Sequence, residues 1–208
     1  MYATILSEEQ YKLLPLVKLF RREFYLVGGT AIALQIGHRM SIDFDLFKAT
    51  PFNSKRVLGK FDDKNYRYTV TRRVSEQMNL TIQGVKMTFF EYPYPIEADQ
   101  DFEKIIRMPS LLSLAAMKAF ALGRRSKWKD YVDLYFLLRD FFTVEAISSK
   151  ATSIYGDEFS GKLFRSQLAY HKDINYSEEV EYMNGFQVND EEIKAFLIDK
   201  ALEDVRFS

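Results

Sequence analysis

The feature that most limits the possible folds is a strand, turn and helix near the N-terminus. Residues 24–27 form an apolar run that predicts a buried strand, and the run enters a tight turn at Gly28 and Gly29. We expect Thr30 to cap a short helix over residues 31–36. A strand that turns directly into a helix is typical of α/β folds.

The next strand-like segment, residues 41–47, carries two acids at alternate positions, Asp43 and Asp45. Successive strand residues point to opposite sides, so these two carboxylates share one face. Their mutual repulsion favours a bound cation or a proton, and Mg²⁺ prefers carboxylate oxygens. The alternative is a solvated strand face, on which alternating acids are ordinary.

The glycine turn upstream favours a bound cation over a solvated strand face. The start of a helix has free N–H groups that can hold an anion, and glycines let the backbone approach a phosphate. Gly28 and Gly29 alone are better explained by a tight connection between strand and helix. A turn of this kind followed closely by Asp43 and Asp45 is the layout that metal-assisted phosphoryl transfer needs.

The rest of the chain predicts a sheet followed by helices. After a helix at 53–65, strands are expected at 66–72, 77–83 and 85–91, and the prolines at 93 and 95 should end the sheet. From about Asp101 onward we expect helices, at 109–122, 128–142, 144–151, 160–171 and 190–202. The predicted fold class is α/β (α+β), a mixed sheet with helices followed by a helical C-terminal half. The predicted domains are residues 1–98 and 99–208.

Composition excludes several classes of protein. Lys plus Arg and Asp plus Glu each number 29 in 208 residues, so bulk charge does not hold this chain to nucleic acid. The absence of cysteine excludes disulfide frameworks, thiolate zinc sites and cysteine nucleophiles. No signal peptide and no stretch long enough to span a bilayer is visible, so we expect a cytoplasmic protein without a membrane partner.

Three motifs follow one another along the first quarter of the chain: Gly28-Gly29-Thr30-Ala31-Ile32-Ala33-Leu34, Gly37-His38-Arg39 and Ser41-Ile42-Asp43-Phe44-Asp45-Leu46-Phe47. Together they resemble the signature of the AbiEii/AbiGii family of nucleotidyltransferase-like toxins. The resemblance continues through Gly84-Val85-Lys86 and Lys118 and covers most of the chain, more loosely after about residue 142. It implies a nucleotidyltransferase-like core.

The resemblance also implies roles for residues of the first half. Asp43 and Asp45 match the metal-binding carboxylates that hold Mg²⁺ and align a nucleoside triphosphate. The nucleotide-binding positions that it implies surround the turn and precede the acids; they are Gly28, Gly29, Thr30, Arg39 and Ser41. An alternative for Arg39 is a structural ion pair with one of the strand acids. We expect His38 at the surface or near the helix end.

Two further site residues are implied in the helical half. Lys118 matches a basic residue that reaches the triphosphate, and Asp130 matches an acid that helps to organise the site. The alternative for Lys118 is a side chain that extends from an apolar helix to solvent. The alternative for Asp130 is an acid that only favours the dipole of a helix that begins beside it.

One departure from the family pattern concerns a third carboxylate, expected on a neighbouring strand. That position is occupied by Thr88, whose neutral hydroxyl replaces neither an anionic metal ligand nor a base. Glu91 lies an odd number of residues away and should point to the opposite face unless a bulge intervenes.

The function that these observations predict is a Mg²⁺-dependent nucleotidyltransferase of toxin–antitoxin type. It would transfer a nucleotidyl group from a nucleoside triphosphate to an RNA (tRNA) or protein acceptor, and a separate antitoxin would be its partner. The alternative is a catalytically impaired relative that binds nucleotide or a partner, which Thr88 favours.

Overall fold

The computed structural model describes residues 1–203, and its chain divides into two compact units, Met1–Ser110 and Leu111–Ser208. Residues 204–208, the end of the predicted C-terminal domain, lie outside the described residues. The first unit holds every strand of the sheet and the second is helical. This confirms the predicted mixed α/β class followed by helices.

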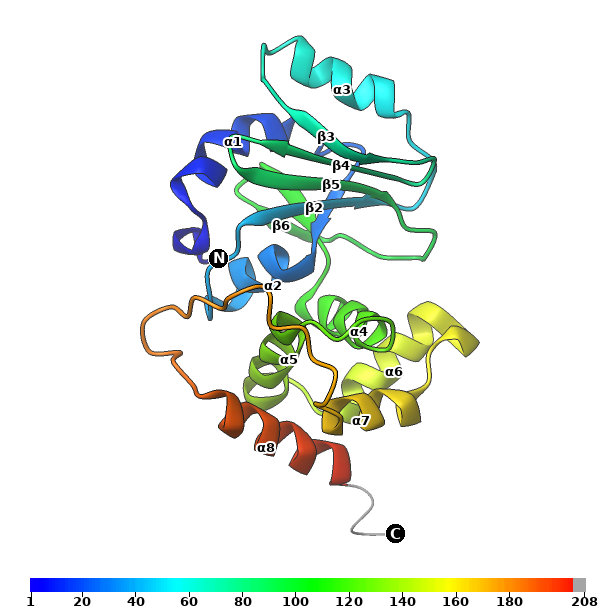
Figure 1. Cartoon of the computed structure of the whole chain (residues 1–208). Helices are drawn as coiled ribbons and strands as arrows, with labels where there is room; N and C mark the ends of the chain where they lie inside the picture. The colour runs from blue at the N-terminus through cyan, green and yellow to red at the C-terminus, as the bar shows by residue number, and fades with distance from the viewer. Residues whose placement is uncertain (204–208) are drawn as a thin grey trace. The chain divides into compact units, whose positions relative to one another are not determined.

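The first unit is built on a seven-stranded mixed sheet within the described residues (Figure 1). Its order is β3-β4-β5-β2-β1-β7-β6, in which β2 runs parallel to β5 and β1 parallel to β7, and the other neighbours are antiparallel. The strands are β1 (Tyr25–Val27), β2 (Asp43–Lys48), β3 (Thr69–Arg73), β4 (Gln77–Ile82), β5 (Val85–Glu91), β6 (Gln100–Phe102) and β7 (Ile106–Met108).

Local signals fix the helices of this unit. A reciprocal capping box between Ser7 and Gln10 begins α1, and the Asn53 side chain accepts two backbone N–H bonds at the start of α3. Gly37 adopts a left-handed conformation, with φ of 75°, and ends α2. These helices are α1 (Glu8–Lys18), α2 (Gly28–Ile36) and α3 (Ser54–Asp62), preceded by a short 3-10 helix, η1 (Ala3–Ile5).

The two faces of the sheet differ in what they carry. One face is apolar, and its aromatic core joins four fully buried rings, with centroids 4.9 to 6.2 Å apart, from Phe20, Phe24, Phe61 and Phe89. Along β4 and β2, buried residues alternate with half-buried residues on the opposite face. The second face is therefore more open to solvent than the first.

The strands β6 and β7 correct the prediction that the chain is helical from about Asp101. They pair with each other and extend the sheet beside β1 through the partners Tyr25 and Arg107. Each has three residues, too few for a recognisable alternation of side chains. Their strand conformation depends on pairing with a distant segment, which local sequence does not reveal.

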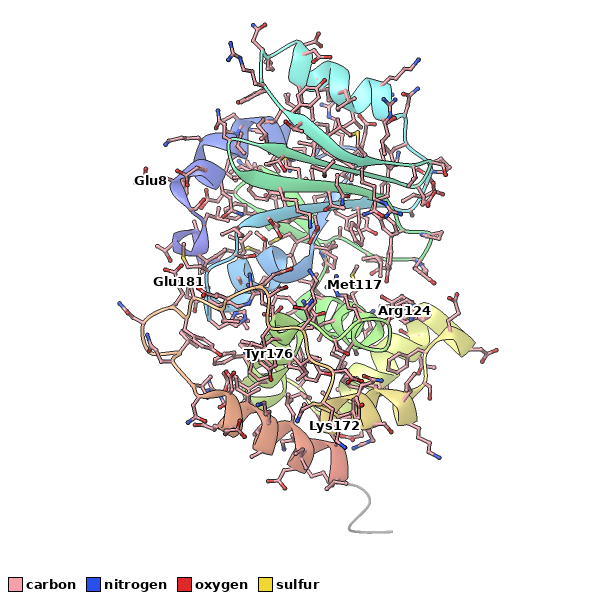
Figure 2. The ribbon with its side chains drawn as sticks, viewed as in Figure 1. Glu8, Met117, Arg124, Lys172, Tyr176 and Glu181 are labelled. Carbon is pink, nitrogen blue, oxygen red and sulfur yellow. The ribbon has the colours of Figure 1, made fainter. Side chains whose placement is uncertain are left out.

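The second unit consists of α4 (Leu111–Leu122), α5 (Trp128–Asp140), α6 (Val144–Tyr155), a 3-10 turn η2 (Gly156–Glu158), α7 (Gly161–Ala169) and α8 (Asp190–Leu202). The ring of Phe120 stacks on that of Tyr155 with centroids 3.7 Å apart, and the guanidinium of Arg124 lies 3.5 Å from the Phe120 ring centroid. The loop before α8 adds Tyr176 (Figure 2), whose ring is 5.3 Å from that of Trp128. Among the described residues, no helix is long and apolar enough to cross a membrane.

Candidate active site

Asp43 and Asp45 occupy alternate positions at the start of β2 and therefore project from the same, more open face. Asp45 lies between Val27 of β1 and Thr88 of β5 in the register of the sheet. Both aspartates are half-buried, so water and small ions can reach their carboxylate oxygens. The predicted pairing of the two acids is thus present in the fold.

The carboxylate of Asp45 lies against the first residue of α2. Gly28 has φ of 72°, and a Cβ placed there would overlap the Oδ2 atom of Asp45. Glycine is needed both for this conformation and for the close approach of the carboxylate. The start of a helix has a partial positive charge, which favours an anionic side chain at this place.

The second glycine of the turn serves a different side chain. A Cβ at Gly29 would overlap the guanidinium of Arg39, which is 2% exposed and donates from Nη1 to the carbonyl of Met40 at 2.9 Å. The two glycines of the turn therefore each make room for one charged side chain: Gly28 for Asp45 and Gly29 for Arg39. A buried guanidinium thus adds positive charge beside the turn.

Thr30 does not cap α2, because the helix begins two residues earlier and its N-cap is Val27. The hydroxyl of Thr30 instead donates to the backbone carbonyl of Asp43, and it accepts from the hydroxyl of Ser41 at 2.8 Å. The side chain of Gln10 also donates to the Asp43 carbonyl, at 3.4 Å. These bonds fix the start of β2, where the acids stand, and Gln10 was not anticipated from the sequence.

The register of β2 and β5 shows where the third carboxylate is missing. Thr88 is the direct partner of Asp45, and the pairing continues without a shift to Lys48 and Glu91. Glu91 therefore lies on the face opposite to the acids, as its spacing predicts in the absence of a bulge. It does not replace the missing carboxylate.

The helical unit contains a buried cluster of charges. The ammonium of Lys118 contacts Asp130 at 2.8 Å and Asp133 at 2.9 Å, and all three side chains are at most 5% exposed. Arg125 forms two hydrogen bonds to Asp130, at 2.8 and 3.2 Å. Burial alone would raise the pKa of Asp130, but the attraction of Lys118 and then of Arg125 outweighs it and lowers the pKa.

Two features of these regions escaped the sequence reasoning. Asp133 was not assigned a role, although it stands three residues after Asp130 and shares its helix face. His38 was expected at the surface or near the helix end; it follows the C-cap of α2, Gly37, but it is completely buried.

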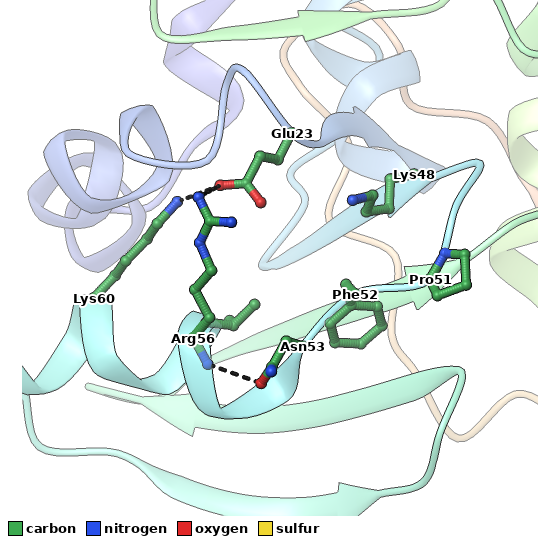
Figure 3. A pocket seen from close by; sticks show the side chains of 8 residues that line it. Glu23, Lys48, Pro51, Phe52, Asn53, Arg56 and Lys60 are labelled. Carbon is green, nitrogen blue, oxygen red and sulfur yellow. Dashed lines mark hydrogen bonds and ion pairs between the residues drawn. The ribbon is translucent and has the colours of Figure 1, made fainter.

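A cavity of about 220 Å³ lies elsewhere in the first unit (Figure 3). Lys48 lines it, and the register of β2 places this lysine on the face opposite to the acids. Glu23 is held there by Lys60 at 3.0 Å and by Arg56 at 3.6 Å. The hydrogen bond from Lys60 is the main cause of the lowered pKa of Glu23. This cavity is separate from the acid pair.

The donor set can be compared with the needs of a metal ion. No group of three or more His, Cys, Asp or Glu side chains that could hold a metal occurs within residues 1–203. Asp43 and Asp45 supply two carboxylates, which is the number that Mg²⁺ commonly takes from a protein when water and phosphates complete its shell. The pair fits Mg²⁺ bound together with a phosphorylated substrate, and it does not form a closed cage.

The mixed sheet, with paired strand acids beside a glycine turn, defines a nucleotidyltransferase fold, and solved structures agree. JHP933 from Helicobacter pylori superposes with a TM-score of 0.57 at 17% identity, over 97% of this chain and 94% of that protein. MenT4, a nucleotidyltransferase toxin from Mycobacterium tuberculosis, gives a TM-score of 0.60 at 14% identity, over 93% and 82%.

The family follows from the sequence match. The model of the nucleotidyl transferase AbiEii toxin family, a type IV toxin–antitoxin system, matches residues 16–204, and the chain belongs to this family. The resemblance stated from the motifs is confirmed, and the nucleotidyltransferase fold agrees with this family. An uncharacterised protein from Aquifex aeolicus is 36% identical over 121 residues, a match that spans 56% of this chain and 58% of that relative.

Proposed function

We propose that the protein transfers a nucleotidyl group from a nucleoside triphosphate to an acceptor hydroxyl, with Mg²⁺ held by Asp43 and Asp45. The observation that carries the proposal is the position of these two half-buried acids on one strand face, with the Asp45 carboxylate against Gly28. The acceptor that we favour is an RNA end, such as that of a tRNA. MenT4, which is similar in fold, is a nucleotidyltransferase toxin, and this similarity supports the class of reaction.

The reaction exchanges one phosphate ester for another. The acceptor oxygen bonds to the α-phosphorus, the bond from that phosphorus to the oxygen bridging to the β-phosphate breaks, and pyrophosphate leaves. Mg²⁺, when bound, neutralises charge on the triphosphate and on the leaving group. Because Thr88 supplies no carboxylate base beside Asp45, the hydroxyl proton is released to water.

The remaining residues of the first unit bind or position the substrate. We propose that the N–H groups at the start of α2, from Gly28, Gly29 and Thr30, hold a phosphate. Arg39 adds positive charge beside Gly29. Thr30 and Ser41 are both buried and bonded to each other, so we propose that they act by fixing the backbone of Asp43.

In the helical unit we propose that Lys118 contributes to triphosphate binding and that Asp130 organises it. The two carboxylates that contact Lys118 fix the position of its ammonium. Arg125 balances the second negative charge. The toxin–antitoxin family supports a separate antitoxin as partner. We propose that the protein acts in the cytoplasm, where triphosphates and RNA are found.

Label transfer tests the proposal. The full chain is incubated with Mg²⁺, each α-labelled triphosphate in turn and total tRNA, and transfer is compared between wild type, Asp45→Asn and Asp63→Asn. Asp63 is an exposed acid at the end of α3 and serves as the matched control. We expect transfer by wild type and Asp63→Asn and none by Asp45→Asn.

Binding of triphosphate without transfer to RNA or protein would contradict the proposal. It would favour the catalytically impaired relative, whose supporting observation is Thr88 in direct register with Asp45.

A further inference from the structure

The open face of the sheet carries more than the acid pair. Residues paired across neighbouring strands point to the same side, so the register defines rows of side chains on this face. One row passes through Asp45, Thr88 and Asn79, and the adjacent row, two residues further along β2, passes through Gln77, Phe90, Phe47, Tyr25 and Arg107. An aromatic row thus lies beside the acidic one.

The rings of this row form a continuous cluster with two tyrosines that follow β5. Phe47 lies 5.1 Å from Phe90 and 5.2 Å from Tyr92, and Tyr92 lies 4.8 Å from Tyr94, measured between ring centroids. We call Phe47, Phe90, Tyr92 and Tyr94 the aromatic platform. Phe47 follows Asp45 by two residues, so the platform begins roughly 7 Å along the strand from the acid.

Exposure separates the platform from the aromatic core on the other face. Phe20, Phe24 and Phe89 of the core are completely buried. All four rings of the platform are only half-buried. Aromatic side chains that remain accessible on the face of a sheet offer π-surfaces on which a planar ligand can stack.

Tyr25 supplies a polar group in the same row. It is 7% exposed, and its hydroxyl has no hydrogen-bond partner among the described residues. Burial, with Tyr92 nearby as the second cause, raises the pKa of Tyr25, so the phenol stays protonated. A buried hydroxyl without a partner is costly, and a ligand with polar edges would relieve that cost.

Positive charge surrounds this face. Lys86 is the partner of Asp43, Arg72 of Asn79 and Arg107 of Tyr25, and all three basic side chains are exposed. Cations on several sides of an aromatic surface complement a ligand that joins planar bases to phosphates. Their spread over three strands and the acid pair between them match a chain of nucleotides better than a single small molecule.

We propose that the aromatic platform stacks an unpaired base of a single-stranded RNA acceptor and so holds the end of that RNA beside Asp43 and Asp45. This inference rests on the proposed function and adds the surface that holds the RNA acceptor and the single-stranded form in which it binds. A folded protein acceptor presents no planar base to the four rings, and a duplex end keeps its bases paired and stacked.

Binding of a short fluorescent single-stranded RNA to the full chain, without triphosphate or metal, tests the proposal by fluorescence anisotropy. Phe47→Leu and Tyr92→Leu keep apolar volume and remove a ring. Each should raise the Kd about tenfold, whereas Phe47→Tyr should keep wild-type affinity. Phe52→Leu is the matched control, because Phe52 is a half-buried ring that lines the cavity on the other face and lies 5.8 Å from the ring of Phe24.

An unchanged Kd in both ring-removal variants, an equal loss in Phe52→Leu, or equal affinity for duplex RNA would overturn the platform. The binding assay is independent of catalysis, so the two proposals fail separately. If wild type transfers label but the ring-removal variants bind RNA as tightly as wild type, only the aromatic platform is contradicted. If the ring-removal variants lose RNA binding but wild type transfers no label, only the proposed function is contradicted.

Discussion

Two pairs of neighbouring acids, one on a strand and one on a helix, differ in their exposure to solvent and in the groups that lie beside them. Asp43 and Asp45 stand two residues apart on a strand and are half-buried. Asp130 and Asp133 stand three residues apart on a helix and are at most 2% exposed. Both spacings bring two carboxylates to one face of their element. Only the strand pair is accessible to ions from solution.

The partners of each pair explain this difference. The buried Lys118 contacts both helix acids, and the half-exposed Arg125 contacts Asp130, so two positive charges meet two negative charges in the second unit. The strand pair lies beside the start of a helix and an exposed face of the sheet. The comparison indicates that the helix pair is buried together with its bases, whereas the more accessible strand pair is suited to an external cation with a substrate.

Removing one acid of the strand pair should give the largest effect. Asp45→Asn should lower label transfer at least about a thousandfold, because a metal ligand is lost where charge develops. The melting temperature should change little, since the side chain is half-buried. Label transfer and thermal unfolding measure the two effects. A lowered melting temperature together with wild-type label transfer would contradict this prediction, because the acid would then stabilise the fold and not serve the reaction.

Removing one acid of the helix pair should act on stability instead. Asp133→Asn leaves the buried Lys118 with a single carboxylate and should cost about 3 kcal/mol of unfolding free energy. Urea unfolding measures this cost, and Glu191→Gln, on the exposed side of α8, is the control. An unchanged urea midpoint for Asp133→Asn would show that the cluster does not stabilise the unit.

Much of the fold was predictable because its signals are local. The bounds of β5 and α8 agree with the prediction to the residue. Before β5 the positive φ values of Gln83 and Gly84 make a two-residue hairpin turn, and α8 begins with an Asn189 side-chain cap. Each signal lies within a few residues of the element that it fixes.

The candidate site was predictable only in part. Asp43 and Asp45 could be placed on one face because strand periodicity needs no partner. The role of Thr30 in fixing the Asp43 carbonyl depends on a contact across 13 residues, and the burial of Asp133 depends on the packing of α4 against α5. Such contacts follow from tertiary structure, which residue spacing does not contain.

A substitution in the glycine turn tests whether the strand acid needs its close approach to α2. Gly28→Ala and Gly84→Ala both place a Cβ at a positive φ, and each should cost about 1 kcal/mol of unfolding free energy. Only the Cβ at residue 28 overlaps Asp45, whereas the space at Gly84 is open. We expect label transfer to fall at least about tenfold in Gly28→Ala alone. Equal transfer in the two variants would show that the carboxylate position is not constrained by the turn.

The smallest effect concerns the pH dependence of the helix pair. Burial acts to raise the pKa of Asp130, but Lys118 and Arg125 outweigh it and hold the pKa below the unfolded value of about 4. The folded state therefore binds this proton less readily than the unfolded state. The stabilisation is complete above about pH 4 and is lost as the pH falls through the folded pKa. Unfolding free energies of wild type and Asp130→Asn, measured across this range, should converge as the solution becomes more acidic. If the difference in unfolding free energy between wild type and Asp130→Asn stays constant down to the folded pKa, the charge of Asp130 does not stabilise the fold. The helix pair would then differ from the strand pair only in its exposure to solvent.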